Sequence, residues 1–290
     1  MKETRGERIF YVINYVFLLL VGLSCLLPLL YILSLSISSP ESIMSGRVKI
    51  LPTEFNTESF RILLERTPIG RAFANSVLIT IVGVVLSMIA TVLAAYPLSR
   101  KYFYGRKFFT LFCVFTMLFS GGLIPAYLVV KGIGLINTYW ALWLPGLIST
   151  YNMLIMRTFF LNIPAELEEA ARIDGCNEVQ LLIIIFLPLS LPVIATLSLF
   201  YFVNYWNAFM NVLIYIVDTA KYNLSVVVNN MIRNQMLLDP NLVQAEDIVQ
   251  TTPEGVRAAG IMVMVIPMLL VYPLLQKYFV KGTMLGSVKG

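Results

Sequence analysis

Long apolar runs alternate with shorter polar stretches along this 290-residue chain. Six of the runs are long enough, at roughly 18 residues or more, to cross a bilayer as helices. They cover residues 9–36, 75–98, 108–130, 138–156, 189–216 and 258–275. The pattern therefore predicts an all-α integral membrane protein with six transmembrane helices.

The composition agrees with a membrane protein. Hydrophobic residues make up 58% of the chain and charged residues 13%, whereas soluble proteins carry about 25% charged residues. The first apolar run follows the basic residues Lys2, Arg5 and Arg8, so a cleaved signal peptide is an alternative interpretation. That run is longer than the ~7–15 apolar residues of a signal peptide, which favours a retained span.

Basic residues are distributed unevenly across the predicted membrane. Six spans place both termini on one side, together with the loops that follow the second and fourth spans. This side carries twelve Lys and Arg against seven Asp and Glu, while the opposite side carries nine of each kind. Because positively charged loops stay in the cytoplasm, both termini are expected to be cytoplasmic. Topology thus accounts for the net charge of +5, and no nucleic-acid partner is needed.

The predicted spans divide the chain into three parts. Residues 1–70 hold the first span and the first extracellular loop, and residues 71–275 form the core transmembrane domain. Residues 276–290 form a basic cytoplasmic tail. Within the core, the cytoplasmic loop at about 161–190 carries a dense group of acidic residues.

This acidic loop has the pattern of two helices joined by a glycine. Pro164 suits the first turn of a helix, and the carboxylates that follow it face the positive end of the helix dipole. Gly175 is placed to end that helix in a left-handed conformation. Asn177 and Gln180 then resemble a capping pair that opens a second helix. An ordinary solvated loop is the alternative that the spacing alone leaves open.

The chain offers little for catalysis or metal binding. It has no histidine, and its cysteines Cys25, Cys113 and Cys176 lie in separate segments, so we predict no catalytic residue and no metal site. No stretch matches the phosphate-binding pattern GxxxxGK[ST], so the chain itself is expected to bind neither ATP nor another cofactor. An enzyme is therefore not expected.

The interiors of the predicted spans carry no ionisable side chain. Asp, Glu, Lys and Arg are absent from the central part of all six runs, whereas ion-coupled transporters usually need such groups there. This argues against proton or sodium coupling. A carrier for a polar solute that acts without an ATPase remains the alternative function.

Uncharged polar residues do occur within the second, fourth and fifth spans, and they have two possible roles. Amides in lipid must find partners, so they face other helices or a wet cavity. One role is to hold helices together, and the other is to line a path for a polar, uncharged solute. The candidate path residues are Tyr151, Asn152, Asn204, Tyr205, Trp206, Asn207 and Asn211.

The acidic loop contains a recognisable motif. Glu169-Ala170-Ala171 is followed after three residues by Gly175 and, after nine more intervening residues, by an I-x-L-P sequence that begins at Ile185. This resembles the permease signature of bacterial ABC importers. Residues 122–145 and 205–209 are similar to the carbohydrate-importer branch, and the tail resembles that of MalG-type subunits. The chain as a whole resembles permeases for complex oligosaccharides in Gram-positive bacteria.

The resemblance implies a type I ABC importer permease in the bacterial cytoplasmic membrane. Such a permease pairs with a second, homologous permease and with two copies of a cytoplasmic ATPase that binds ATP and Mg²⁺. An extracellular solute-binding protein or lipoprotein delivers the substrate. This substrate is expected to be a carbohydrate, and more specifically an oligosaccharide. Uncharged span interiors suit neutral sugars without excluding uronic-acid oligosaccharides.

The resemblance also implies roles for residues of the acidic loop. Glu169 would be the carboxylate that docks onto the ATPase, and Gly175 the turn between the two coupling helices. Ala170 and Ala171 would provide a close-packing face. The full set of expected coupling residues is Glu168, Glu169, Ala170, Ala171, Asp174, Gly175, Ile185, Leu187 and Pro188.

Overall fold

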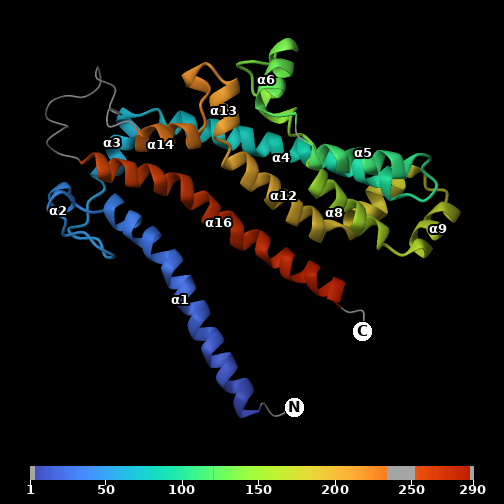
Figure 1. Ribbon diagram of the computed structural model, residues 1–290, viewed down its shortest axis with the longest axis horizontal. Coiled ribbons are helices and arrows are strands. Elements are labelled where there is room, and N and C mark those ends of the chain that lie inside the picture. The colour runs from blue at the N-terminus through green and yellow to red at the C-terminus, as the bar shows by residue number, and fades with distance from the viewer. Residues whose placement is uncertain (1–3, 120, 234–251, 288–290) are drawn as a thin grey trace. The chain divides into compact units, whose positions relative to one another are not determined.

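The computed structural model describes residues 4–119, 121–233 and 252–287 (Figure 1). Within these ranges the regular elements are helices, apart from one isolated antiparallel bridge between Ser38 and Phe55, which confirms the predicted all-α class. The α-helices are α1 Arg5–Ser36, α2 Pro40–Met44, α3 Glu58–Arg66, α4 Ile69–Ser99, α5 Arg106–Leu118, α6 Leu123–Gly132, α7 Trp140–Trp143, α8 Thr150–Leu161, α9 Ala165–Ile173, α10 Glu178–Gln180, α11 Leu187–Leu189, α12 Leu191–Trp206, α13 Met210–Tyr215, α14 Leu224–Arg233 and α16 Pro253–Ser287. A π-helix, η1, covers Leu181–Phe186 and a 3₁₀ turn, η2, covers Thr219–Lys221.

The chain divides into two compact units. One unit comprises Met1–Gly70 and Val227–Ile266, and the other, which we call the core unit, comprises Arg71–Val226 and Pro267–Gly290. The acidic loop and all the candidate path residues belong to the core unit.

Three helices are long and apolar enough to cross a membrane without interruption. They are α1 from Gly6, α4, and α16 as far as Pro273, and they agree with the first, second and sixth predicted spans. Two further pairs of helices meet the same criterion only if each bent pair counts as one span. The described part of the chain therefore holds up to five candidate spans, against the six predicted.

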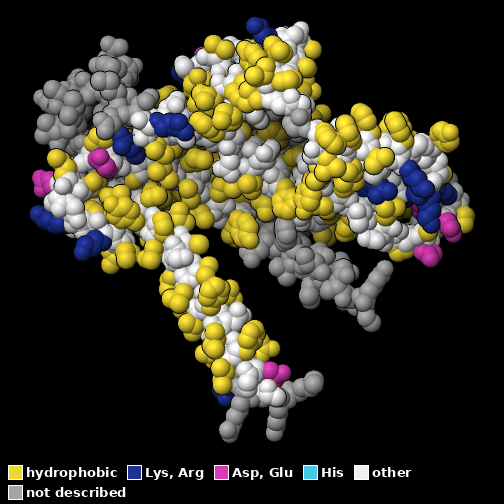
Figure 2. Space-filling model, in the orientation of Figure 1, with side chains coloured by type: hydrophobic (Ala, Val, Ile, Leu, Met, Phe, Trp, Pro, Cys, Tyr) yellow, Lys and Arg dark blue, Asp and Glu magenta, His cyan; other side chains and the backbone are white. Residues whose placement is uncertain are grey.

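Helix α1 is apolar on all sides. Thr4 and Glu7 form a capping box at its start, in which Thr4 N donates to Glu7 Oε2 at 2.7 Å. Along the rest of the helix the surface is mainly hydrophobic, with charge only near its N-terminal end (Figure 2). Such a helix is stable in lipid or against other helices rather than in water.

The predicted third span is two helices. α5 ends at Leu118, α6 begins at Leu123, and the pair is bent by more than 40°. Gly122 has φ +86°, a left-handed conformation that does not continue a helix. The prediction of one helix over 108–130 is therefore wrong.

The predicted fourth span is also interrupted. The four-residue helix α7 is followed by a loop, and α8 begins only at Thr150 and continues to Leu161. Pro145 lies in this loop, where it lacks the helical N–H donor and restricts the preceding residue. The prediction of one helix over 138–156 is wrong for this reason.

The predicted fifth span is broken at both ends. The chain turns by 81° at Ser190, between Glu178–Leu189 and α12, and α12 ends at Trp206, with three residues between it and the start of α13 at Met210. At 1.5 Å per residue, the 16 residues of α12 are about 24 Å long, which is less than the ~30 Å hydrocarbon core. One continuous helix over 189–216 is therefore a wrong prediction.

Segments predicted as polar loops contain helices. The first, residues 38–70, holds α2 and α3, and the second, residues 217–257, holds η2, α14 and the start of α16. α14 is amphipathic and buries Val226, Val228 and Met231, which explains why a helix forms within a segment predicted as a polar loop. The rest of this second loop, residues 234–251, lies outside the described residues. Most of the predicted tail continues α16, which ends at Ser287.

Close packing of α4 on α12 forms the centre of the core unit. The Tyr205 hydroxyl lies 2.9 Å from Ser87 Oγ, and the Tyr201 hydroxyl lies 2.7 Å from Thr91 Oγ1. The approach is possible because Gly83 has no side chain, since a Cβ there would lie 2.7 Å from the Tyr205 ring. A small residue at a helix crossing is typical of membrane proteins.

Replacing Gly83 by alanine is expected to destabilise the core unit. The added methyl would overlap a ring that is only 4% exposed, at an expected cost of about 1–3 kcal/mol. Thermal unfolding of the purified protein measures the effect as a lowered melting temperature. Gly70→Ala is the matched control, because it lies in the same helix with open space around its Cβ position. Equal melting temperatures for the two variants would contradict the packing argument.

Candidate functional site

The first helix of the acidic loop forms as predicted. α9 covers Ala165–Ile173 with acidic residues in its first turn. Gly175 ends it with φ +83°, and Cys176 N donates back to Ala171 O at 3.0 Å. The predicted glycine turn is confirmed. Pro164 is the N-cap residue and lies just before the first turn instead of within it.

The second helix opens at the predicted capping pair. Gln180 N donates to Asn177 Oδ1 and Asn177 N donates to Gln180 Oε1, both at 2.9 Å. After α10 the helix widens into the π-helix η1 before it returns to α-geometry in α11. π-helical segments are rare and occur mostly at functional sites.

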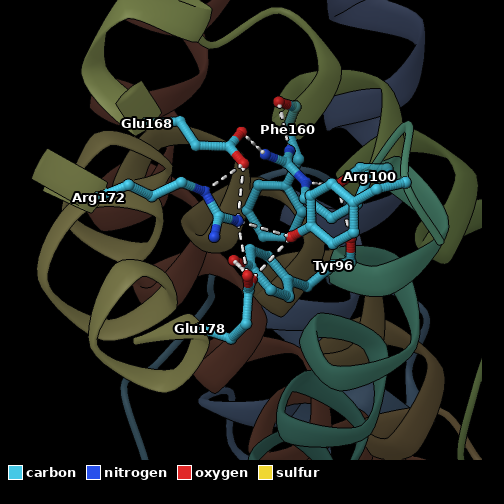
Figure 3. A network of polar contacts seen from close by, with 8 residues as sticks. Tyr96, Arg100, Phe160, Glu168, Arg172 and Glu178 are labelled. Atoms are coloured by element: carbon cyan, nitrogen blue, oxygen red, sulfur yellow. Dashed lines mark hydrogen bonds and ion pairs between the residues drawn. The ribbon is translucent and has the colours of Figure 1, made fainter. Parts of the chain in front are cut away.

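Glu168 connects α9 to the end of α4. Its Oε2 accepts a hydrogen bond from Arg100 Nη1 at 2.7 Å (Figure 3). The Arg100 side chain is 7% exposed and that of Glu168 is 19% exposed. Arg100 also donates to Phe160 O at 3.2 Å and to Ser99 Oγ at 3.0 Å. Each of the three guanidinium nitrogens of this buried arginine thus donates a hydrogen bond at the point where α9 meets α4.

Arg172 connects the two helices of the acidic loop. Its Nη2 donates to Glu168 Oε1 and to the Tyr102 hydroxyl, each at 3.0 Å, and also to Glu178. Glu178 Oε2 in turn accepts from the hydroxyls of Tyr96 at 2.8 Å and Tyr102 at 2.7 Å. We call these residues the Arg100 cluster: Tyr96, Arg100, Tyr102, Glu168, Arg172 and Glu178.

Aromatic rings enclose the guanidinium of Arg100. Its Cζ lies 4.3 Å from the centre of the Phe186 ring and 5.2 Å from that of Tyr96. These two rings and Phe160 pack edge to face. Because the charge is buried, removing its Glu168 partner is expected to cost about 3–5 kcal/mol.

The exposed part of the cluster does not titrate near neutral pH. Hydrogen bonds to Glu178 and Glu168 raise the pKa of the Arg172 guanidinium. Burial, followed by the hydrogen bond to Glu178, raises the pKa of the Tyr102 hydroxyl. Both groups therefore keep their protons, and this arrangement serves positioning rather than proton transfer.

One face of α9 points away from the cluster. Glu166, Glu169, Ala170 and Ile173 recur at helical spacing and are exposed; we call them the α9 outer face. Ile173 is 86% exposed, whereas Ala171 on the opposite face is only 5% exposed. Figure 2 shows charged side chains gathered near the α5 and α9 end of the core unit. An acidic face with an exposed isoleucine suits contact with another protein.

The other predicted coupling residues have different surroundings. Asp174 and Pro188 are exposed, and Ile185 and Leu187 are partly buried. Leu187 and Pro188 line an apolar groove together with Met88 and other residues of α4. The two neighbouring alanines of the motif differ in their surroundings, since Ala170 lies on the exposed outer face and Ala171 is buried.

Three of the predicted path residues are buried by helix packing. They are Asn152, Tyr205 and Trp206, at 5%, 4% and 3% exposure. Besides the bond of Tyr205 to Ser87, the Trp206 ring packs edge to face on Phe73 of α4 with centroids 6.0 Å apart. This geometry agrees with the interpretation that these side chains hold helices together.

The remaining path residues lie on the surface of the core unit. Tyr151 on α8 is exposed, and so are Asn204, Asn207 and Asn211. The three asparagines follow one another at intervals of three and four residues, across the break where α12 ends. We call them the amide row. Amides left at the surface of an apolar helix are available to a polar solute.

The comparison with protein families decides the identity of this fold. Residues 2–284 match the family described as the inner membrane component of binding-protein-dependent transport systems. The chain belongs to this family. It is a permease subunit of an ABC importer for carbohydrates, as the acidic-loop motif predicted.

Relatives align with the permease over its whole length. It is 41% identical to the polygalacturonan/rhamnogalacturonan transport system permease protein YtcP of Bacillus subtilis, over 98% of this chain and 99% of that protein. It is 40% identical to protein LplC of the same organism, over 100% and 98% of the two chains. A crystal structure of a bacterial ABC transporter involved in the import of the acidic polysaccharide alginate matches with a TM-score of 0.88 and 32% identity, over 96% of this chain and 99% of that chain.

Three residues of the Arg100 cluster escaped the sequence analysis of the permease. Arg100 was counted there only among the basic residues that predict the membrane topology, and neither Tyr96 nor Tyr102 was a candidate residue. Tyr96 and Arg100 are four residues apart, so they share one helical face at the end of a long apolar span. A tyrosine and an arginine so placed, opposite an acidic loop, are the signal that could have pointed to them.

Proposed function

We propose that this permease forms a heterodimer with a second, homologous permease and is driven by two copies of a separate cytoplasmic ATPase. An extracellular binding protein delivers the substrate. The chain crosses the bacterial cytoplasmic membrane six times with both termini in the cytoplasm, and the broken helices α5–α6, α7–α8 and α12–α13 complete the third, fourth and fifth spans. Broken helices suit a transporter, because irregular backbone within a membrane occurs where it lines a cavity.

The α9 outer face is the observation that carries this proposal. The chain has no phosphate-binding loop of its own, so energy must enter through a contact with another subunit. Glu169 and Ile173 offer charge and apolar surface on the cytoplasmic loop, and Gly175 holds the angle to the next helix. Closure of the ATPase dimer on ATP would move α9 as a lever and shift the spans between two states.

Co-purification tests this proposal. The tagged permease, expressed together with its partner permease and ATPase, is expected to recover the ATPase from detergent extracts. Transport activity should then require all of these subunits. Solute uptake by the permease alone would support instead a carrier that acts without an ATPase.

For the substrate, we infer an acidic oligosaccharide. Support comes from the substrates for which two similar transporters are named, polygalacturonan or rhamnogalacturonan and alginate. The amide row fits this class because Asn204, Asn207 and Asn211 offer N–H donors to carboxylates and hydroxyls. No aspartate or glutamate lies in the described parts of α12 or α13 to repel an anion.

Stimulation of ATP hydrolysis by single sugars distinguishes acidic from neutral substrates. The complete transporter in liposomes, with its binding protein, is expected to hydrolyse ATP faster in the presence of trigalacturonate. A neutral trisaccharide such as maltotriose should give no stimulation. Stimulation by maltotriose alone would refute the acidic class while leaving the importer intact.

Replacing Asn207 by leucine is expected to reduce uptake at least about tenfold, because a hydrogen bond to a charged group contributes about 1.5–3 kcal/mol. ATPase co-purification should stay normal, since Asn207 is exposed and distant in the chain from α9. Asn14→Leu, an exposed amide in the apolar helix α1, is the matched control. Normal uptake by Asn207→Leu would show that the amide row does not contact the substrate.

A further inference from the structure

A buried ion pair between Arg100 and Glu168 attaches α9 to the end of α4, and the Tyr96 hydroxyl of α4 donates separately to Glu178 of α10. Arg100 follows directly after α4, and Glu168 lies in the middle of α9, 68 residues further along the chain. α4 is one of the three uninterrupted spans. A displacement of α9 at Glu168 therefore acts on the end of a continuous 31-residue helix.

We propose that Arg100 and Glu168 are positioning residues that form a rigid joint, through which movement of α9 is passed to α4 and from there to the amide row. This inference rests on the proposed function, in which an ATPase moves α9.

The guanidinium of Arg100 cannot turn independently of its surroundings. Its three nitrogens donate in three directions, to Glu168, to Phe160 O and to Ser99 Oγ. The rings of Tyr96 and Phe186 lie over it. With its nitrogens bonded and these rings against it, the side chain transmits displacement instead of absorbing it.

Beyond the joint, α4 is hydrogen-bonded to α12. α4 carries Ser87 and Thr91, which are hydrogen-bonded to Tyr205 and Tyr201 of α12. All four side chains are buried. Asn204 and Asn207 lie next to Tyr205 and Trp206 at the end of α12, so a shift of α4 reaches the amide row through direct contacts.

The neighbouring ion pair of Arg172 provides a matched comparison. Arg172 binds the other carboxylate oxygen of Glu168, but its side chain is 41% exposed against 7% for Arg100. Its other carboxylate partner, Glu178, is 46% exposed. Exposed pairs of this kind contribute little to rigidity. Arg172→Gln therefore removes the same charge from the same cluster without breaking the joint.

The test uses the complete transporter with Cys25, Cys113 and Cys176 replaced by alanine and one cysteine introduced at Asn204. The rate at which a maleimide modifies this cysteine reports opening of the path. Addition of the nonhydrolysable nucleotide AMP-PNP is expected to change the rate at least about fivefold in the otherwise unaltered transporter and in Arg172→Gln. In Arg100→Gln the nucleotide effect should vanish, although the ATPase still co-purifies and hydrolyses ATP. Arg100→Lys should restore part of the effect because the charge returns.

Several outcomes would overturn the joint. A full nucleotide effect in Arg100→Gln shows that α9 moves the path by another route. Loss of ATPase co-purification in Arg100→Gln shows that Arg100 only maintains the shape of the loop. Glu168→Gln breaks the same pair with an isosteric side chain, so a full nucleotide effect there is equally decisive if Arg100→Gln fails to insert. Failure of the ATPase to co-purify with the unaltered transporter would overturn the proposed function as well. A full nucleotide effect in Arg100→Gln overturns the joint alone.

Discussion

Two adjacent glutamates of α9 are expected to respond in opposite ways to replacement by lysine. Glu168→Lys should unfold or prevent insertion of the permease, because it places a second cation against the buried Arg100 guanidinium and leaves both charges unpaired. The expected loss of stability is about 3–5 kcal/mol or more. Glu169→Lys should leave stability unchanged, because Glu169 is exposed and makes no hydrogen bond or ion pair with another described residue.

Glu169→Lys should instead abolish recovery of the ATPase, because it reverses the charge of the α9 outer face. Thermal unfolding and ATPase pull-down of the two variants, measured side by side, check both statements. Glu166→Gln is a milder change on the same face and should weaken recovery only slightly. Normal recovery of the ATPase by Glu169→Lys would remove this carboxylate from the docking surface.

Gly175→Val is expected to abolish assembly with the ATPase and therefore uptake. Gly175 has φ +83°, and a β-branched residue resists this conformation at a cost of about 1–3 kcal/mol. No atom lies within 4 Å of the position of its missing Cβ. The whole effect must therefore come from the backbone, which would leave the left-handed turn and misdirect α10.

Two controls separate this turn from general damage. Gly175→Asn should retain most of the assembly, because asparagine adopts the left-handed conformation more readily than other side chains. Gly134→Val introduces the same strain at φ +74° in the loop after α6, away from the acidic loop in sequence, and should not affect ATPase recovery. Normal assembly of Gly175→Val would contradict a structural role for the turn.

Local signals explain why the acidic loop was predictable. The capping pair Asn177–Gln180 and the left-handed Gly175 act through atoms a few residues apart. Their sequence pattern therefore contains almost all of the relevant physics. The spans α1, α4 and α16 were predictable for a similar reason, because the length of an apolar run decides whether a helix can cross the membrane.

Hydropathy could not predict where apolar runs break. Pro145 and Asn207 both lie inside apolar runs long enough to cross a membrane, yet the helices stop there. A break leaves backbone groups that need other partners. For α12 these come from distant parts of the chain, such as the amide of Asn223, which donates to Ala208 O, and the hydroxyl of Ser225, which donates to Trp206 O.

The sequence by itself determined a helical membrane protein with an acidic loop of two helices joined by a glycine, because hydrophobic length, charge and helix caps are local properties; the motif in that loop indicated the permease family. Only the tertiary structure decided which glutamate of that loop faces inward. Glu168 and Glu169 are neighbours with the same chemistry, and one is directed to Arg100 because α9 packs against the end of α4. The division of the path candidates into buried and exposed residues has the same origin, since burial depends on which helices meet.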